Sequence, residues 1–463
     1  MTDTSHDPGP GSPKLDSPSL DNDVLLAPIA RVRDLLDRQE VSPVELVEAA
    51  LDRIARRNPE LNAFSSVAGE EALAQAHASA HRIAHNQQLG PLDGIVVAVK
   101  DNVAVAGMPM ECGSAVLRGN VATEDASCVV ALRQAGAVII GKTTLDEFTL
   151  TTVGPARNPL DTSLTPGGSS GGSGVAVQAG MCFAAIGTDT GGSVRIPAEC
   201  CAVTGLKPTQ GLLRTDGVLP LAASLDHLGV LARTTEDTAC FLEALLPGRP
   251  SGIGLGIGLG DHPNTRRHRI GIPNDLSLVD EPVRARFLAA VERAAQQGTE
   301  VTEVTLPDLD QIKSAHWTIL SSEIATYHLR RFGRDEDRYL EPMRDTIAGG
   351  ATVTTAEYLA AQESRGLMRR TVDELLADLD ALALPTLAIT VPAHDAERVQ
   401  IGGSYDDVTA AMVRLTSLFN HSGHPAISVP PATAPRDQPS GIQLVAPHYH
   451  ERPLLGLASA FEG

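Results

Sequence analysis

The sequence predicts an α/β fold in which a mixed, mostly parallel central sheet is covered by helices. Short apolar strands alternate with helical segments from the strand ending at Lys100 to about residue 245, and such alternation is typical of parallel strands joined by crossover helices. Hydrophobic residues make up 42% of the 463 residues, which is enough for a large core. No run reaches the roughly 18 apolar residues of a membrane-spanning helix, so we expect no membrane partner.

The first helices and strands follow in order along the chain. Ser42 and Glu45 form a capping box around Pro43, which predicts a helix over residues 42–58. A valine-rich strand ends at Lys100. The remaining predicted elements are a helix over 70–86, helix and strand pairs over 128–142 and 174–190, strands within 269–275, 381–389 and 425–432, and helices over 281–298, 309–331 and 355–379.

Composition limits the possible partners and the compartment. With 37 basic and 57 acidic residues, the net charge of −20 argues against a nucleic-acid partner. Residues 1–24 are acidic and rich in Pro, Ser and Gly, which predicts a disordered tail rather than a signal peptide. The six cysteines show no CxxC spacing, so we expect reduced thiols in the cytoplasm. Glycines alternate strictly within 251–269, which favours a mobile linker over a dinucleotide loop.

Two glycine-rich segments carry serines. Residues 166–174 are PGGSSGGSG, and residues 187–197 are GTDTGGSVRIP. Glycines let the backbone approach another molecule closely, and N–H groups beside a serine hydroxyl suit an oxyanion hole. Neither segment ends in the Gly-Lys-Ser/Thr of a phosphate loop. The GxSxG letters around Ser169 follow a loop instead of a strand, which argues against a nucleophile elbow with a histidine.

A serine nucleophile requires a base, and no histidine is clearly placed for that role. Lys100 ends an apolar strand, where burial would lower its pKa, and Ser–Lys variants of the serine triad exist. These motifs resemble the amidase signature family of amide hydrolases. The matching segments are DGIVVAVKDN, GKTTLDEFTL, NPLDTSLTPGGSSGGSGVAVQAG, IGTDTGGSVRIPA and GLKPT, and a weaker similarity extends from about residue 30 to 462.

The resemblance implies a Ser-cisSer-Lys triad. Lys100 would be the general base, Ser169 the bridging serine after a cis peptide bond from Gly168, and Ser193 the nucleophile that forms an acyl-enzyme. The implied oxyanion hole consists of the backbone N–H groups of Thr190, Gly191, Gly192 and Ser193, and the implied supporting residues are Asp189, Arg195, Ser170 and Gly168.

The resemblance also implies the architecture and the activity. Residues 25–463 would form one large domain with the amidase signature fold, and residues 250–380 would include a variable linker and a helical cap over the active-site mouth. The enzyme would need no metal or cofactor. It would hydrolyse the C–N bond of small or medium amides, and the same chemistry extends to esters and carbamates (urethanes). A homodimer is expected because many relatives dimerise.

Two other functions remain open. The glutaminase component of a glutamyl-tRNA(Gln) amidotransferase, known as its A subunit, resembles this chain and releases ammonia from glutamine within a complex. Against it, the segment LLRTDGVLPLAASLDHLG follows GLKPTQG, where that component typically carries a Tyr- and Ser-rich stretch. A non-catalytic protein that kept the fold is the third hypothesis, and the presence of Lys100, Ser169 and Ser193 argues against it.

Further residues are weaker candidates. Substrate-pocket candidates are Met110, Trp317 and Tyr327. The row His77, His81 and His85 has helical spacing that can bind zinc, although a solvated polar face is the expected role. We expect His448 and His450 to lie in a surface loop. Thiols near the motif loops that could be reactive are Cys112, Cys200 and Cys201.

Overall fold

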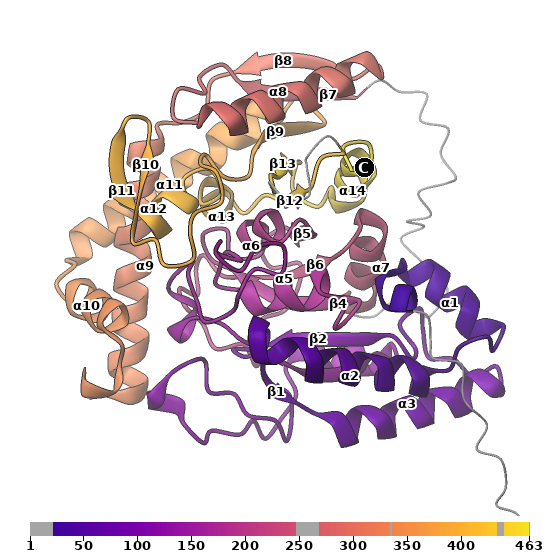
Figure 1. Ribbon diagram of the computed structural model, residues 1–463. Coiled ribbons are helices and arrows are strands. Elements are labelled where there is room, and N and C mark those ends of the chain that lie inside the picture. The colour runs from indigo at the N-terminus through magenta and orange to yellow at the C-terminus, as the bar shows by residue number, and fades with distance from the viewer. Residues whose placement is uncertain (1–21, 247–267, 334–335, 433–438, 463) are drawn as a thin grey trace, which may run out of the picture.

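The computed structural model describes residues 22–246, 268–333, 336–432 and 439–462. An 11-stranded sheet runs through the molecule from β1 near the bottom of Figure 1 to β8 at the top. Its strands, in spatial order, are β1 (Phe64–Val67), β3 (Val138–Thr143), β2 (Val96–Lys100), β4 (Ala184–Asp189), β6 (His227–Ala232), β5 (Thr204–Lys207), β12 (Ala426–Val429), β13 (Ile442–Val445), β9 (Ala381–Pro385), β7 (Arg269–Pro273) and β8 (Glu300–Val304).

The sheet is mixed, as predicted. β2 pairs in parallel with both β3 and β4, and β7 pairs in parallel with both β8 and β9. Between these two groups, β6, β5, β12 and β13 pair antiparallel with their neighbours. No helix lies between β5 and β6, so the chain returns beside itself in the opposite direction there. The β–α alternation of the sequence therefore located the parallel pairs but not the antiparallel centre.

The predicted helices are present, and α2 begins with the predicted capping box between Ser42 and Glu45. Seven further helices of the described residues were not predicted, namely α1, α6, α7, α10, α12, α13 and α14. The helices are α1 (Ile29–Asp37), α2 (Pro43–Leu61), α3 (Gly69–Ala84), α4 (Ser127–Gln134), α5 (Gly171–Gln178), α6 (Arg195–Cys200), α7 (Thr235–Leu245), α8 (Glu281–Gln296), α9 (Leu309–Phe332), α10 (Glu341–Gly350), α11 (Thr355–Leu375), α12 (Val408–Met412), α13 (Leu418–Ser422) and α14 (Glu451–Ala458). No helix of the described ranges carries an apolar stretch sufficient to cross a bilayer.

Two predicted segment boundaries need correction. A short 3₁₀ helix, η1 (Asn22–Leu26), already belongs to the fold because Leu25 is buried, while residues 1–21 lie outside the described residues. Most of the glycine-rich stretch also lies outside the described residues, which resume after the gap at 247–267.

The segment 250–380, predicted as a linker and a helical cap, also contributes to the central sheet, because β7 and β8 extend it. Only α9, α10 and α11 form a separate helical layer, on the left of Figure 1.

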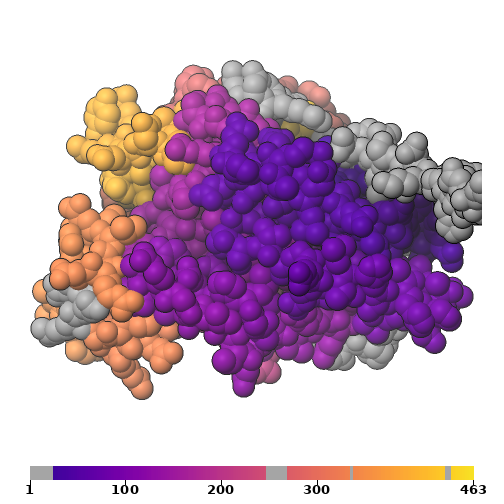
Figure 2. Space-filling model, turned by 60° about the horizontal axis from the view of Figure 1, so that its bottom comes forward, coloured from indigo at the N-terminus to yellow at the C-terminus, as the bar shows by residue number. Residues whose placement is uncertain are grey.

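Helix α5 explains why the sequence uses so many small residues. Every residue from Gly171 to Val177 is buried, and α5 lies in front of the middle of the sheet in Figure 1. A Cβ at Gly172 would lie 2.6 Å from the backbone N of Thr144, so only glycine allows this approach. Figure 2 shows the N-terminal half of the chain covering most of one face, with the α9–α10 region at its edge. The residues on either side of α5 are therefore deep inside the molecule.

Candidate active site

The predicted catalytic residues converge at one edge of the sheet. Lys100 ends β2, Ser169 lies just before α5, and Ser193 lies between β4 and α6. Because β2 and β4 pair in parallel, their carboxyl ends meet at the same edge, where α/β proteins commonly bind ligands. Lys100 Nζ donates a hydrogen bond to Thr188 Oγ1 on β4 at 2.9 Å, which joins the two strand ends directly.

Lys100 is fully buried, and its ammonium group also donates to Ser169 Oγ at 2.8 Å. Burial lowers the pKa of Lys100 to about 7, and the charges of Asp146, Asp189 and Asp226 limit that decrease. A substantial fraction of Lys100 is therefore a neutral amine near pH 7. The lone pair of that amine can then accept the Ser169 proton across the same 2.8 Å contact.

The two serine segments are joined by hydrogen bonds from Ser170. Its hydroxyl donates to the Thr188 carbonyl at 3.1 Å and accepts from the Thr188 N–H at 3.2 Å. Its backbone N–H donates to the Ser193 carbonyl at 3.2 Å. The peptide bond between Gly168 and Ser169 is cis, as the resemblance implied. Ser193 is 8% exposed, against 2% for Ser169, so Ser193 is nearer to solvent.

A buried ion pair shapes the loop that precedes Ser193. Arg195 Nη2 lies 2.8 Å from Asp189 Oδ1, and Arg195 Nε donates to Asp189 Oδ2 at 3.0 Å. Burial alone would raise the pKa of the Asp189 carboxyl, but the Arg195 charge reverses that effect and holds the pKa below its usual range. Asp189 Oδ2 also accepts from the Val194 N–H at 3.1 Å. These contacts bring the chain on both sides of residues 190–193 together.

The loop itself requires glycine at residue 192. Gly192 has φ +142°, and a Cβ there would lie 2.3 Å from Thr416 Oγ1. The same Thr416 hydroxyl donates to the Gly191 carbonyl. At the start of the loop, Thr190 Oγ1 donates to Asp226 Oδ1 at 2.6 Å. The backbone of residues 190–193 is thus held from several sides, which is what a preorganised oxyanion hole needs.

Replacing Arg195 with Met should destabilise the protein by about 3–5 kcal/mol, because the Asp189 charge would remain buried and unpaired. Urea unfolding measures this loss. The matched control is Arg56→Met, which removes an exposed ion pair with Asp52 on α2 and should cost at most about 1 kcal/mol. Equal stabilities for the two variants would show that the buried ion pair does not hold the loop.

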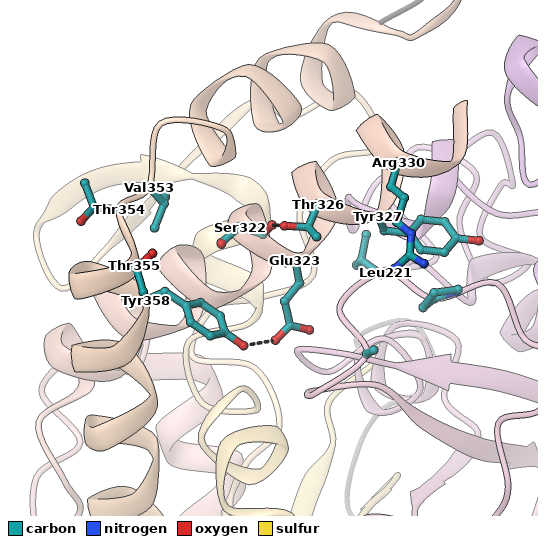
Figure 3. Close-up of a pocket in the computed structure, with 12 residues that line it drawn as sticks. Leu221, Ser322, Glu323, Thr326, Tyr327, Arg330, Val353, Thr354, Thr355 and Tyr358 are labelled. Carbon is teal, nitrogen blue, oxygen red and sulfur yellow. Dashed lines mark hydrogen bonds between the residues drawn. The ribbon is translucent and has the colours of Figure 1, made fainter. Parts of the chain in front are cut away.

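Of two neighbouring cavities, only the smaller is lined by residues of the site described above, and neither is lined by Lys100, Ser169 or Ser193. The smaller, of about 60 Å³, is lined by Asn102, Thr188, Thr190 and Asp226 among others. The larger, of about 580 Å³, lies between α9, α11 and the loop containing Leu221 (Figure 3). Both cavities share Pro220, Leu221 and Ala223 in their walls.

The three pocket candidates differ in position. Tyr327 lines the larger cavity. Met110 and Trp317 line neither of these two cavities and instead pack, half-buried, against a hydrophobic cluster that includes Phe148 and Ile319. Local sequence could not separate the three because each is an apolar side chain near a motif or on a helix.

The other sequence candidates take different roles. His77 and His81 are exposed on α3 and His85 is exposed just after it, as expected for a solvated polar face. The hypothesis of reactive thiols is wrong for all three cysteines, because each is fully buried and burial raises the pKa of each thiol. These cysteines are Cys112, Cys200 and Cys201.

Sequence reasoning missed several polar residues around the site. Burial raises the pKa of Asp146 to about 7, and its charge interacts with that of Lys100. Asn420 Nδ2 donates to both the carbonyl and Oδ1 of Asp189, at 2.9 and 2.8 Å. Asp146 lies within the matching segment GKTTLDEFTL, which was the available signal, and Asp226 lies within LLRTDGVLPLAASLDHLG. Asn420 lies in NHSGHPAISVP, which gave no indication of a contact with Asp189.

The fold and this site define an α/β protein with a lysine and two serines at one sheet edge. The chain belongs to the amidase family, since the family model described as Amidase matches residues 45–455. It is 34% identical to the A subunit of the glutamyl-tRNA(Gln) amidotransferase of Symbiobacterium thermophilum, over 94% of this chain and 96% of that protein. A solved amidase structure is 30% identical, with a TM-score of 0.86, over 94% of this chain and 99% of that chain. The solved A subunit of the Thermotoga maritima amidotransferase is 29% identical, with a TM-score of 0.74, over 95% of each chain.

Proposed function

We propose that this protein hydrolyses the C–N bond of small or medium amides through an acyl-enzyme on Ser193. The observation that carries the proposal is the contact between Lys100 Nζ and Ser169 Oγ, together with the lowering of the Lys100 pKa to about 7 by burial. A base whose pKa lies near the working pH is present in its neutral form and still binds a proton strongly enough to take part in transfer.

In the proposed reaction, neutral Lys100 accepts the Ser169 proton while Ser169 accepts the proton of Ser193. Ser193 Oγ forms a bond to the amide carbon, and the carbonyl electron pair moves to the oxygen. The protonated relay then delivers its proton to the leaving nitrogen, the C–N bond breaks and the amine departs. Water attacks the resulting ester through the same relay, which regenerates Ser193 and releases the acid.

The backbone N–H groups of residues 190–193 would stabilise the negative oxygen of the tetrahedral intermediate. Support comes from the contacts of Thr190 and Gly191 with Asp226 and Thr416, which fix the loop before substrate arrives. Donors that are already fixed need no reorganisation when charge develops, so they stabilise the transition state more than the substrate.

The larger cavity supports a substrate of small or medium size. Its volume of about 580 Å³ falls within the range of small-molecule sites. Tyr327 and Tyr358 offer ring surface there, while Glu323 and Arg330 offer charges (Figure 3). Because α9 and α11 supply these residues, we propose that this helical layer covers the active-site mouth. Esters and carbamates present the same carbonyl to Ser193 and are included in the proposed substrate class.

A second candidate is the glutaminase component of a glutamyl-tRNA(Gln) amidotransferase. The 34% identity to the Symbiobacterium thermophilum protein over nearly its whole length supports it. The higher TM-score with the amidase, 0.86 against 0.74 for the Thermotoga maritima protein, supports an enzyme that acts alone. We favour the independent amidase, working in the cytoplasm as its free cysteines suggest and assembling as a homodimer.

A release assay on the purified protein separates the two candidates. The substrates are an acylated nitroaniline, an aryl carbamate, a primary aliphatic amide and glutamine, with Ser193→Ala as the matched blank. We expect turnover of the anilide or the carbamate without any partner. Failure with all four substrates, followed by glutamine cleavage only after the other amidotransferase components are added, would contradict the independent amidase and support the second candidate.

A further inference from the structure

Three side chains from distant segments of the chain meet beside the C-terminal end of α11. Asp373 lies near the end of α11, His424 lies just after α13, and His448 lies in the loop before α14. Asp373 Oδ1 lies 3.1 Å from His424 Nε2 and 3.8 Å from His448 Nε2. One potential ligand atom from each residue falls within 4.8 Å of the other two.

Hydrogen bonding within the described residues does not account for this cluster. Neither Nε2 atom has a hydrogen-bond partner there, and His424 Nδ1 has none either. The His424 side chain is only 1% exposed, so bulk solvent does not reach it. Leaving a buried polar group without a partner is unfavourable, and such groups in folded proteins usually have one.

The chemistry of these side chains suits a cation. Both Nε2 atoms lack a hydrogen-bond partner among the described residues, and a ring nitrogen of this kind can present its lone pair to a metal ion. The positive charge of Arg369 opposes a cation, but this side chain is exposed, so solvent and salt screen its charge.

We propose that Asp373, His424 and His448 bind one divalent transition-metal ion of the zinc class. Two imidazoles and a carboxylate are ligands of that class, at about 2.0–2.2 Å from the ion. Tetrahedral binding at those lengths separates ligand atoms by about 3.3 Å, and the observed 3.1 and 3.8 Å lie on either side of that value. The Asp373 side chain is 48% exposed, so an ion can enter and keep water at its remaining position.

The bound ion would join the end of α11 to the segments that follow α13 and precede α14. This role does not depend on the proposed hydrolysis at Ser193. The sequence gave no sign of the site, and we expected no metal, because the ligands come from three segments without any local motif. His448 was expected only to lie in a surface loop, and its half-buried ring instead packs at 3.9 Å, centre to centre, from that of His424.

The test uses the full-length protein after treatment with EDTA, titrated with Zn²⁺ by calorimetry and with Co²⁺ by visible absorption. We expect one equivalent of Zn²⁺ to bind and Co²⁺ to develop a visible band. Asp373→Asn and His448→Ala should each weaken Zn²⁺ binding by more than the roughly 10–100-fold typical of losing an outer partner. Asp373 is half-exposed, so we expect its substitution to leave the fold intact. His424 is buried, and its removal could destabilise the fold, so it is not used in this test.

Two control variants make the result specific. His450→Ala removes the neighbouring exposed histidine and should leave Zn²⁺ affinity unchanged. The double variant His81→Ala/His85→Ala removes a second histidine pair, the α3 pair, whose rings stack 4.2 Å apart at the C-terminal end of α3, and should leave Zn²⁺ affinity unchanged. The proposal is overturned if no Zn²⁺ binds at micromolar concentration, or if binding survives Asp373→Asn and disappears with the α3 pair.

Discussion

Ser193→Ala is expected to lower kcat on amides by about 10⁴–10⁶-fold while leaving the fold unchanged. The substitution removes one hydroxyl from a side chain that is already nearest to solvent among the three catalytic candidates. Without that hydroxyl no acyl-enzyme forms, and only binding and the oxyanion hole remain to assist attack by water. The measurement is steady-state turnover of the best substrate from the release assay, with a thermal unfolding curve to verify the fold.

Labelling with a fluorophosphonate provides a readout that does not depend on the substrate. Wild-type protein should take up one label, found on Ser193 by mass spectrometry, and Ser193→Ala should take up none. The matched control is Ser173→Ala, a buried serine of the other glycine-rich segment, whose hydroxyl donates to the Ile186 carbonyl at 3.0 Å. That variant should lose stability but keep its label. Wild-type turnover in Ser193→Ala would exclude the proposed mechanism.

Lys100→Met is expected to lower kcat/KM by about 10²–10⁴-fold, the usual contribution of a general base. Methionine fills much of the space of the lysine side chain but cannot accept the Ser169 proton. The wild-type enzyme should show kcat/KM rising with pH and levelling above about 7, because Lys100 is protonated and inactive below its lowered pKa and neutral above it. Lys100→Met should lose this rise. A pH–rate profile of both proteins checks the prediction.

Lys142→Met is the control for Lys100→Met. Lys142 is equally buried, but its ammonium group lies 3.1 Å from Asp101 Oδ1 instead of contacting a serine. Its removal should lower the unfolding temperature and leave the pH rise in place. If the rise near pH 7 persists in Lys100→Met, another group such as Asp146, whose pKa burial also raises to about 7, controls the reaction.

The sequence by itself predicted the elements that depend on local pattern. Hydrophobic period, capping residues and glycine content located α2, β2 and α5 because these signals act between residues close in the chain. The candidate catalytic residues were also predictable, since Ser169 and Ser193 lie inside contiguous motifs and Lys100 ends a strand that precedes them. The resemblance implied Asp189 and Arg195 as supporting residues, and the structure shows that they form an ion pair.

Only the tertiary structure decided how distant segments meet. Strand direction at the centre of the sheet, the contact of Asn420 with Asp189 and the walls of the larger cavity each join segments far apart in the chain. The lowered pKa of Lys100 also depends on the tertiary structure, because several elements together bury its side chain. Desolvation and hydrogen bonding depend on which groups are brought together by packing. Contacts of this kind between distant segments cannot be predicted from the local periodicity of the sequence. The cluster of Asp373, His424 and His448 arises in the same way.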